Sequence, residues 1–557
     1  MKFSLSWLRQ YLETDKSVDE LATSMTAIGL EVESIEDPAV KLAPFHIAHV
    51  IEAKQHPNAD KLRLCVVDTG DGHVQVVCGA PNARTGMKGV FAPSGSTVPG
   101  TGLKLKPSKI RGVESNGMLC SEREMGLSDE HEGIIDLPED APIGQPFAAY
   151  MGLDDPLFDI AITPNRADCL GVSGIARDLA AAGMGRFIEP DVTPIVGSFK
   201  SPLGVRFEFS DGMEDACPLF VGRYIKGVKN GASPKWMQDR LLSVGLRPIS
   251  ALVDMTNYLT IDLNRPVHVF DADKVAGDHL WLRTGCDGAK FDALNGKEYT
   301  LDGEMTAIGD GNGVLSLAGV MGGESSGCTE ETTNVFIEIA LFDPVRTAAT
   351  GRKLNLESDA RYRFERGVDP EFAVPGMEAA TRLVQEMCGG EASELVVTGA
   401  VPEWRREGAF RPSRVHSLGG VELDALACDS ILQKLGFGTQ ELGSDHIAAE
   451  PPAWRGDIVG EADLVEEVLR IHGFDNIPAV SLPRLQRRAG SGIALAPRRL
   501  GWARRALAAR GMSEAVTWSF MPEAQAKLFG GAPPELTLAN PISSDFDVMR
   551  PSILPNL

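Results

Sequence analysis

A run of short β-rich segments between residues 44 and 150 constrains the fold more than any other feature. Four such stretches stand at 45–52, 63–68, 74–78 and 89–93, and Gly, Pro and Asn residues separate them. Several short strands at regular spacing, divided by turn residues, are typical of a small barrel or sandwich. We therefore expect a separate β domain over residues 39–150.

The length of the chain calls for more domains than this one. A chain of 557 residues exceeds a single hydrophobic core, so roughly three to five domains are expected. No apolar run approaches the ~18 residues of a membrane helix, and the N-terminus lacks the apolar core of a signal peptide. The nine cysteines are scattered without a C-x-x-C pair. We expect reduced thiols in the cytoplasm, and neither a disulfide framework nor a structural zinc site.

Changes in composition divide the chain into successive segments of a multidomain α+β protein. Residues 1–38 predict two short helices, and Ser17 and Glu20 have the spacing of a capping box. Further helices are expected at 172–182, 424–435 and 461–472, each followed by a glycine. The expected segments are a helical N-terminus (1–38) packed with a connector (151–204), the β domain (39–150), a mixed α/β domain (205–395), a small α+β domain (404–480) and the start of a further domain (484–557).

The net charge of −23 opposes indiscriminate binding of nucleic acid. One basic segment reverses this balance, because no acidic residue occurs between Asp475 and Glu514. Its arginines are Arg484, Arg487, Arg488, Arg498, Arg499, Arg504, Arg505 and Arg510. They indicate either a contact with phosphate or an acidic partner, or a solvated helix face.

The stretch 246–271 contains polar groups that could converge on a small polar substrate. Thr256 and Asn257 are adjacent, a turn with Asn264 follows, and His268 comes twelve residues after Thr256. None of these groups is a strong nucleophile. The alternative is a well-packed turn with a structural histidine.

Glu338 interrupts the apolar strand-like run VFIEIALF. A carboxylate between Ile337 and Ile339 is unusual unless it faces a polar site or has a partner. Because side chains alternate along a strand, a solvent-facing residue is the alternative.

A helix over 461–472 would place Asp463, Glu466, Glu467 and Arg470 on one face. Asp457 precedes the helix and could fold back onto that face. Gathered carboxylates form a hard oxygen site suited to Mg²⁺. The alternative is an ordinary helix with acidic residues near its start and a Glu466–Arg470 pair.

Three segments of the β domain resemble the tRNA-binding OB-fold module of several tRNA synthetases: HPNADKL (56–62), VCGAPNARTG (77–86) and KIRGVESNGMLCSEREMGL (109–127). The resemblance implies RNA binding through loops and one sheet face. The expected phosphate contacts are Lys61, Lys104, Lys106, Lys109 and Arg111. The glycines of these loops are also explained by tight turns alone.

The whole chain resembles the β subunit family of bacterial phenylalanyl-tRNA synthetase. The order of segments and the motifs AGVMGG (318–323), SDARYRFERG (358–367) and NPISSDFDVMRPSILP (540–555) carry this resemblance. Family members continue for roughly two hundred further residues, so the sequence looks truncated at its C-terminus. The resemblance implies a degenerate class II catalytic-like domain at 484–557.

The resemblance also implies that 205–395 is an editing domain that hydrolyses tRNA-Phe mischarged with tyrosine. The implied pocket residues are Thr256, Asn257, His268, Gly322, Glu338 and Ala360. Glu338 would accept the tyrosine hydroxyl. With no activated nucleophile in the pattern, we expect hydrolysis by a positioned water, helped by a ribose hydroxyl of the substrate.

The implied partners are an α subunit, in an (αβ)₂ tetramer, and tRNA-Phe. The α subunit would hold ATP, and Asp457, Asp463, Glu466 and Glu467 would bind Mg²⁺ shared with it. A tRNA-binding scaffold without editing activity and a freestanding trans-editing hydrolase are the alternatives.

Overall fold

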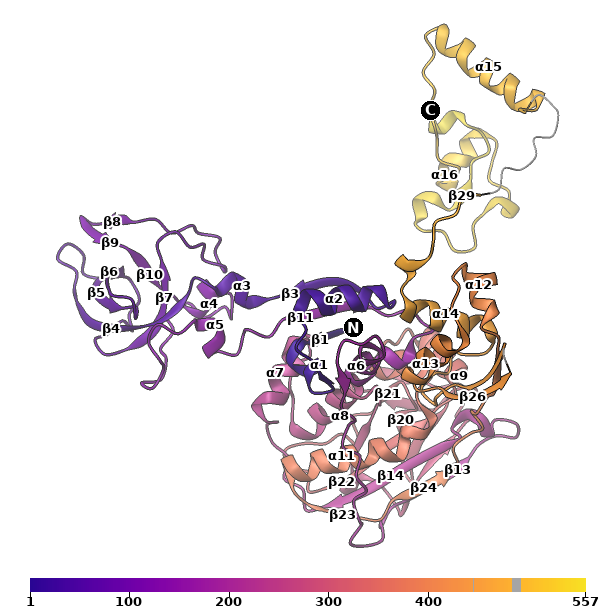
Figure 1. The fold of residues 1–557 in the computed structure, drawn as a ribbon, viewed down its shortest axis with the longest axis horizontal. Helices are drawn as coiled ribbons and strands as arrows, with labels where there is room; N and C mark the ends of the chain where they lie inside the picture. The colour runs from indigo at the N-terminus through magenta and orange to yellow at the C-terminus, as the bar shows by residue number, and fades with distance from the viewer. Residues whose placement is uncertain (444, 483–491) are drawn as a thin grey trace. The chain divides into compact units, whose positions relative to one another are not determined.

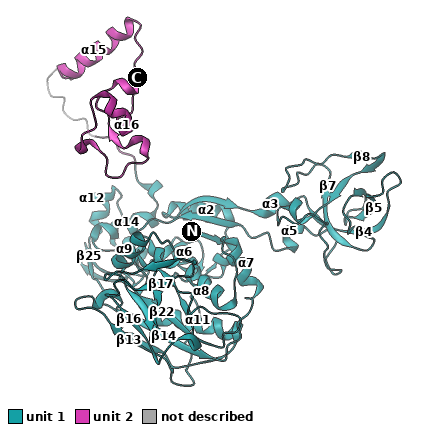
Figure 2. Ribbon diagram, turned by 180° about the vertical axis from the view of Figure 1, so that it is seen from behind, with its two compact units in different colours: residues 1–478 teal, residues 479–557 magenta. Residues whose placement is uncertain are grey.

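The computed structural model describes residues 1–443, 445–482 and 492–557. The chain divides into two compact units, Met1–Pro478 and Ala479–Leu557 (Figure 2). Among the helices of the described residues, none is long and apolar enough to cross a bilayer. Arg484, Arg487 and Arg488 of the basic segment lie outside the described residues.

The N-terminal segment and the connector share a small sheet. Three antiparallel strands pair in the order β1 (Lys2–Ser4), β11 (Leu157–Ala161) and β3 (Glu31–Glu36). Helix α1 (Leu5–Arg9) precedes α2 (Val18–Ala27), which begins with the predicted capping box: Glu20 N donates to Ser17 Oγ, and Ser17 N donates to the Glu20 carboxylate. The sequence predicted both helices but missed the strands, since strands this short carry little periodicity.

The connector also contains helix α6 (Val172–Ala181), which is almost entirely buried. Its apolar residues join a core with Phe3, Trp7 and Leu8 of the N-terminus. Gly183 follows the helix with φ +80°, the left-handed conformation expected of a glycine that ends a helix.

Five antiparallel strands form the nearly closed sheet of the β domain. Their order is β10 (Gly117–Leu119), β7 (Lys88–Pro93), β4 (His46–Gln55), β5 (Arg63–Asp68) and β6 (His73–Cys78). The four predicted stretches correspond to β4 to β7, with ends that agree within three residues. A register shift between Val50 and Glu52 marks a bulge in β4, and bulges bend a strand and increase its twist.

Two sheets dominate the segment 205–400. The central sheet has the order β15 (His268–Asp271), β22 (Asn334–Leu341), β14 (Leu219–Lys226) and β23 (Glu391–Ala392), with β24 (Val396–Gly399) also paired to β14. The second sheet has the order β13 (Gly204–Glu208), β16 (His279–Arg283), β19 (Ala307–Asp310), β20 (Gly313–Leu317) and β21 (Met321–Gly322). Helices α8 (Ala251–Asp262) and α11 (Ala373–Cys388) lie beside the central sheet (Figure 1).

The two faces of the central sheet belong to different cores. Along β22, Val335, Ile337 and Ile339 pack with the apolar residues of α8 and α11. Phe336 and Ala340 point to the other face and pack with residues of the second sheet, such as Leu280 and Ile308. Glu338 has the same parity as Phe336 and Ala340, so its side chain points into the layer between the two sheets.

The small α+β domain has one antiparallel sheet and three helices. The strand order is β25 (Gly408–Phe410), β27 (His446–Glu450) and β26 (Gly438–Gly443), and the helices are α12 (Ser413–Gly419), α13 (Ala425–Lys434) and α14 (Glu461–His472). Helices α13 and α14 agree with their predicted ranges within one residue.

The second unit begins its described part with helix α15 (Leu495–Ala509), none of whose residues is buried. Arg504 pairs with the Glu514 carboxylate, while Arg499 and Arg505 are exposed. Two short strands, β28 (Phe520–Met521) and β29 (Val548–Met549), pair beside α16 (Glu523–Ala526). Both interpretations of the basic segment remain compatible with this exposed helix.

A buried ion pair joins β14 to α11 and is expected to control the stability of the central sheet. The Arg223 guanidinium contacts the Glu378 carboxylate at 2.7 Å, and both side chains are almost fully buried. We predict that Glu378→Ala lowers the unfolding free energy by about 3–5 kcal/mol, because it leaves a buried cation without its carboxylate partner. Urea unfolding measures this.

The matched control is Glu391→Ala on β23, which removes the carboxylate partner of Lys226. Lys226 lies on β14, the strand that also contains Arg223. That pair lies at the surface, with side-chain exposures of 47% and 65%, so its loss should cost less than about 1 kcal/mol. Equal effects of the two substitutions would contradict the prediction.

Candidate functional site

Glu338 and His268 form a direct cross-strand pair in the central sheet. Glu338 of β22 lies opposite His268 of β15 in antiparallel register, so both side chains project from the same face. Glu338 is 6% exposed and its Oε2 atom has no hydrogen-bond partner among the described residues. Burial raises the pKa of this carboxyl to about 8. The alternative of a solvent-facing Glu338 is therefore wrong, and the side chain is protonated at neutral pH.

His268 is held by contacts with an aromatic ring and a backbone. Its ring meets Phe270 edge to face, with centroids 4.4 Å apart. A Cβ at Gly322 of β21 would lie 2.4 Å from His268 Cε1, so only glycine allows this approach. Burial lowers the pKa of His268 to about 4, and its buried Nε2 has no partner among the described residues. The imidazole is neutral at pH 7.

The remaining pocket residues of the prediction lie on separate helices. Thr256 and Asn257 are on α8, where Thr256 Oγ1 donates to Val253 O. Among the described residues, no hydrogen bond joins either side chain to His268 or Glu338. Ala360, on α10 (Asp359–Phe364), packs against the core between the two sheets. The structure thus brings His268, Glu338 and Gly322 together and leaves their convergence with Thr256 and Asn257 a prediction.

Two residues of this site were not found from the sequence. Phe270, two residues after His268 on the same strand face, orients its ring. Gly222 lies opposite Glu338 on β14, and a Cβ there would meet the Phe336 ring at 2.3 Å. The two-residue period of a strand would have indicated Phe270. Gly222 could not be found in this way, because its position opposite Glu338 depends on the pairing of β14 with β22, which leaves no pattern in the local sequence.

The pair offers hydrogen bonds rather than a nucleophile. A protonated carboxyl both donates and accepts, and a neutral imidazole does the same. The buried Cys217 thiol is no ready nucleophile either, because burial, assisted by the nearby Glu338, raises its pKa. The arrangement suits the recognition of a hydroxyl group and the positioning of water.

The raised pKa of Glu338 makes a prediction about stability. A carboxyl whose pKa rises from 4.5 to about 8 on folding stabilises the protein most at low pH, and this stability is lost as the pH rises through 8. The glutamine of Glu338→Gln does not titrate, so its stability lacks this pH dependence. When the pH is raised from 4.5 to 8.5, the unfolding free energy of the variant minus that of the unmodified chain should increase by roughly 4 kcal/mol.

Urea unfolding at several pH values measures this difference. His268 titrates in the opposite sense, losing stability as the pH falls from 6.5 to about 4, but it is present in both proteins and cancels. A constant difference for Glu338→Gln would contradict a buried, protonated carboxyl.

The acidic helix α14 has a different arrangement from the one predicted. Glu467 is buried, and the guanidinium groups of Arg455 and Arg470 both contact its carboxylate. Burial opposes its ionisation, but the Arg455 hydrogen bond and the Arg470 charge outweigh burial and lower its pKa to about 2. Glu466 is exposed. The expected Glu466–Arg470 pair is wrong, since Arg470 pairs with Glu467 and with Asp178 of α6 at 2.7 Å.

The other two predicted magnesium ligands also have internal partners. Both Asp457 oxygens accept from Arg455 at 2.8 Å, and Asp463 Oδ2 accepts from the backbone N–H groups of Val459 and Gly460. In the part of the chain that the structure describes, no three His, Cys, Asp or Glu side chains gather as metal ligands do. Arginines pair with two of the four residues and the helix start engages a third, so their role as Mg²⁺ ligands stays a prediction.

Neighbouring substitutions test this arrangement. Glu467→Gln should lower the unfolding free energy by about 3 kcal/mol, because it weakens contacts to two buried guanidinium groups. Glu466→Gln, at the exposed neighbouring position, should change it by less than about 0.5 kcal/mol. Thermal unfolding with and without Mg²⁺ completes the test. A midpoint that rises with Mg²⁺ in the unmodified chain, and not in Glu467→Gln, would show that the carboxylates bind the ion.

The five predicted phosphate contacts of the β domain are all exposed. Lys109 and Arg111 belong to a hairpin of β8 (Ser108–Ile110) and β9 (Val113–Ser115), and Arg111 has φ +49° at its turn. The loop 56–62 packs on this hairpin, because Asn58 Nδ2 donates to Arg111 O at 3.0 Å. These contacts place Lys61, Lys109 and Arg111 on two adjoining loops. Lys109 is 3.7 Å from Glu114, so part of its charge is compensated.

Comparison with known proteins finds family matches in successive segments of the chain. The sequence matches four family descriptions in order: "Putative tRNA binding domain" at 45–146, "B3/4 domain" at 216–389, "tRNA synthetase B5 domain" at 409–474 and "Phenylalanyl tRNA synthetase beta chain CLM domain" at 483–557. It is 56% identical to the phenylalanine–tRNA ligase beta subunit of Paramagnetospirillum magneticum and 55% identical to those of Rhodospirillum rubrum and Cereibacter sphaeroides. Each alignment covers all of this chain and 69% of the relative.

Proposed function

Because the chain belongs to the family of phenylalanine–tRNA ligase beta subunits, we propose that it binds tRNA-Phe and removes tyrosine wrongly attached to it. The observation that carries this is an identity of 55–56% along the entire chain, with four family domains in the same order. The chain is thus a component of an aminoacyl-tRNA synthetase, a ligase.

Each segment of the chain has its own role in this proposal. The barrel of residues 39–150 is an OB-fold that binds tRNA through Lys61, Lys104, Lys106, Lys109 and Arg111. Residues 205–395 are the editing domain, 404–480 form a small α+β domain, and 484–557 begin a degenerate class II catalytic-like domain. The N-terminal segment 1–38 and the connector 151–204 join these parts.

Editing is needed because a pocket sized for phenylalanine cannot strongly reject a side chain with one extra hydroxyl. The second pocket must instead select that hydroxyl. Glu338 is suited to this, since a protonated carboxyl can exchange two hydrogen bonds with a phenol group. A phenylalanyl ester leaves this buried carboxyl unpaired, which costs about 1–3 kcal/mol.

The remaining pocket residues position the ester. Gly322 lets the backbone of this chain approach the substrate closely, and Ala360 forms a small wall. His268, Thr256 and Asn257 orient the ester, the terminal adenosine or a water molecule by hydrogen bonds. Hydrolysis uses this water and a ribose hydroxyl of the substrate, with no covalent intermediate.

The ligase reaction itself requires partners. An α subunit in an (αβ)₂ tetramer holds ATP and carries out aminoacylation with Mg²⁺, while this chain acts as scaffold. In this proposal Asp457, Asp463, Glu466 and Glu467 would hold a Mg²⁺ ion together with the α subunit, after exchange of the internal contacts that three of them make in this chain.

Deacylation of tyrosyl-tRNA-Phe and phenylalanyl-tRNA-Phe, with and without the α subunit, tests the proposal. The unmodified chain should hydrolyse the tyrosyl ester faster. Glu338→Ala should reduce that preference by roughly 5–150-fold, which corresponds to about 1–3 kcal/mol. Glu391→Ala, on strand β23 of the same sheet, should leave it unchanged.

Equal rates for both esters in the unmodified chain would overturn the selection by Glu338 and favour a scaffold without editing. An aminoacyl adduct on any side chain of 205–395 would contradict the water mechanism. Full activity without an α subunit would favour a freestanding hydrolase.

A further inference from the structure

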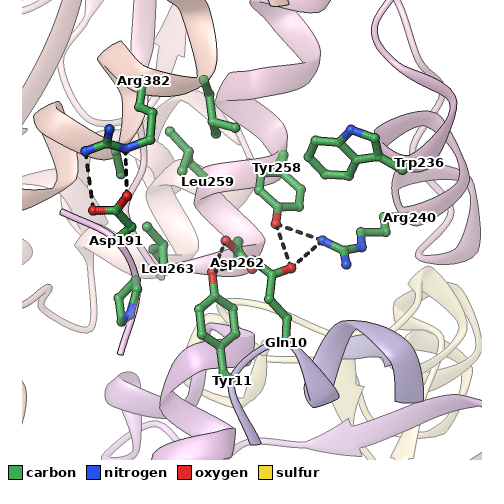
Figure 3. A pocket seen from close by; sticks show the side chains of 13 residues that line it. Gln10, Tyr11, Asp191, Trp236, Arg240, Tyr258, Leu259, Asp262, Leu263 and Arg382 are labelled. Carbon is green, nitrogen blue, oxygen red and sulfur yellow. Dashed lines mark hydrogen bonds and ion pairs between the residues drawn. The ribbon is translucent and has the colours of Figure 1, made fainter. Parts of the chain in front are cut away.

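A second cavity lies away from the Glu338 site, between α8, α11, the N-terminal segment and helix α7 (Lys235–Ser243). Its volume is about 360 Å³. Cavities of this order hold small ligands. Figure 3 shows Gln10, Tyr258 and Arg240 joined on one side and the Arg382–Asp191 pair on the other. Because α8 packs on the face of the central sheet opposite Glu338, the cavity is separate from the Glu338–His268 pair.

The floor of this cavity is fully hydrogen-bonded. Asp262 is 2% exposed, and one of its oxygens accepts from Trp7 Nε1 at 2.6 Å. The other accepts from Tyr11 Oη at 2.5 Å (Figure 3). Trp7 also stacks on Tyr258, with centroids 5.3 Å apart. The floor therefore has fixed geometry and few polar groups left for a ligand.

Arg240 supplies a cation that forms no ion pair among the described residues, although its charge acts on the nearby buried Asp262 carboxyl. Its Nη1 donates to Gln10 Oε1 at 2.6 Å and to Tyr258 Oη at 2.9 Å. Among the described residues, it has no carboxylate partner, and its Nε and Nη2 atoms make no hydrogen bond. On the opposite wall, Arg382 is paired with Asp191 at 3.2 Å. The planar guanidinium of Arg240 is thus the group available to pair with a phosphate.

Trp236 places an exposed aromatic ring beside that cation. Its side chain is 43% exposed, and the Arg240 guanidinium lies 5.2 Å from its ring. Tyr258 meets Trp236 edge to face at 5.3 Å, which holds the indole in place. An aromatic ring next to an arginine is the arrangement with which proteins stack an unpaired base and hold its phosphate.

The rest of the lining is apolar. Leu259, Leu263, Ala379 and Leu383 form a wall that suits the faces of a planar group and offers no charge of its own.

From these contacts we propose that the cavity binds a nucleotide, whose base stacks on Trp236 while its phosphate pairs with Arg240. A base and a phosphate are present both in a free nucleotide and in an unpaired nucleotide of RNA. Binding of an RNA nucleotide rests on the proposed function in tRNA binding, whereas binding of a free nucleotide does not.

The test measures binding of AMP by calorimetry and of tRNA-Phe by filter binding, with the full chain. Trp236→Leu removes the stacking ring, and Arg240→Lys keeps the charge but removes the planar fork. Each should weaken AMP binding at least about 5-fold, the effect expected for losing one stacked base or one paired fork. Leu242→Ala is the control, since Leu242 lies on the same helix, is 57% exposed and does not line the cavity.

Weaker binding of AMP and of tRNA in Trp236→Leu, with an unchanged unfolding midpoint, supports an RNA nucleotide as the occupant. Weaker binding of AMP alone supports a free nucleotide. Unchanged affinity for AMP in both variants, or no binding of AMP by the unmodified chain, overturns the inference. Failure of the chain to bind tRNA at all would count against the proposed function, and the AMP measurements would still decide the cavity.

Discussion

A charged side chain that leaves water must be paired or must lose its charge. The interior of this chain contains both solutions. Arg223 and Arg470 keep their charges because Glu378 contacts the first and Glu467 and Asp178 contact the second. Glu338 and His268 have no partner of opposite charge, and burial shifts each pKa toward the neutral form. Paired groups hold elements together, whereas the unpaired neutral groups remain available to a ligand.

The central sheet has the buried ion pairs on one face and the neutral Glu338–His268 pair on the other. Its face toward α8 and α11 is apolar apart from buried pairs such as Arg223–Glu378, and it carries the connection to the N-terminal segment. Its other face, toward the second sheet, contains Glu338 and His268 among aromatic rings. One helix, α8, takes part in both regions: Thr256 and Asn257 belong to the predicted editing pocket, while Tyr258 and Asp262 line the second cavity. The structure shows the helix lining the second cavity, whereas its part in the editing pocket stays a prediction.

Local signals made much of the fold predictable. The capping box of α2 and the glycines after α6, α13 and α14 mark ends that the structure confirms. A short apolar run predicted the strand around Glu338 but not the face on which this residue lies, because burial depends on what covers each face. The strands β1, β3 and β11 were missed, since they exist through pairing between segments more than a hundred residues apart.

The acidic helix shows most clearly where sequence information ends. Helical spacing permits Arg470 to pair with either Glu466 or Glu467, three or four residues away. The sequence by itself determined that a helix forms at 461–472, that it is acidic, and to which family the chain is similar. Only the tertiary structure decided that Arg470 pairs with Glu467 and Asp178, and that Arg455 neutralises Asp457. The physical reason is that charges in the interior take the partners that packing places beside them, and Asp178 is 292 residues away along the chain.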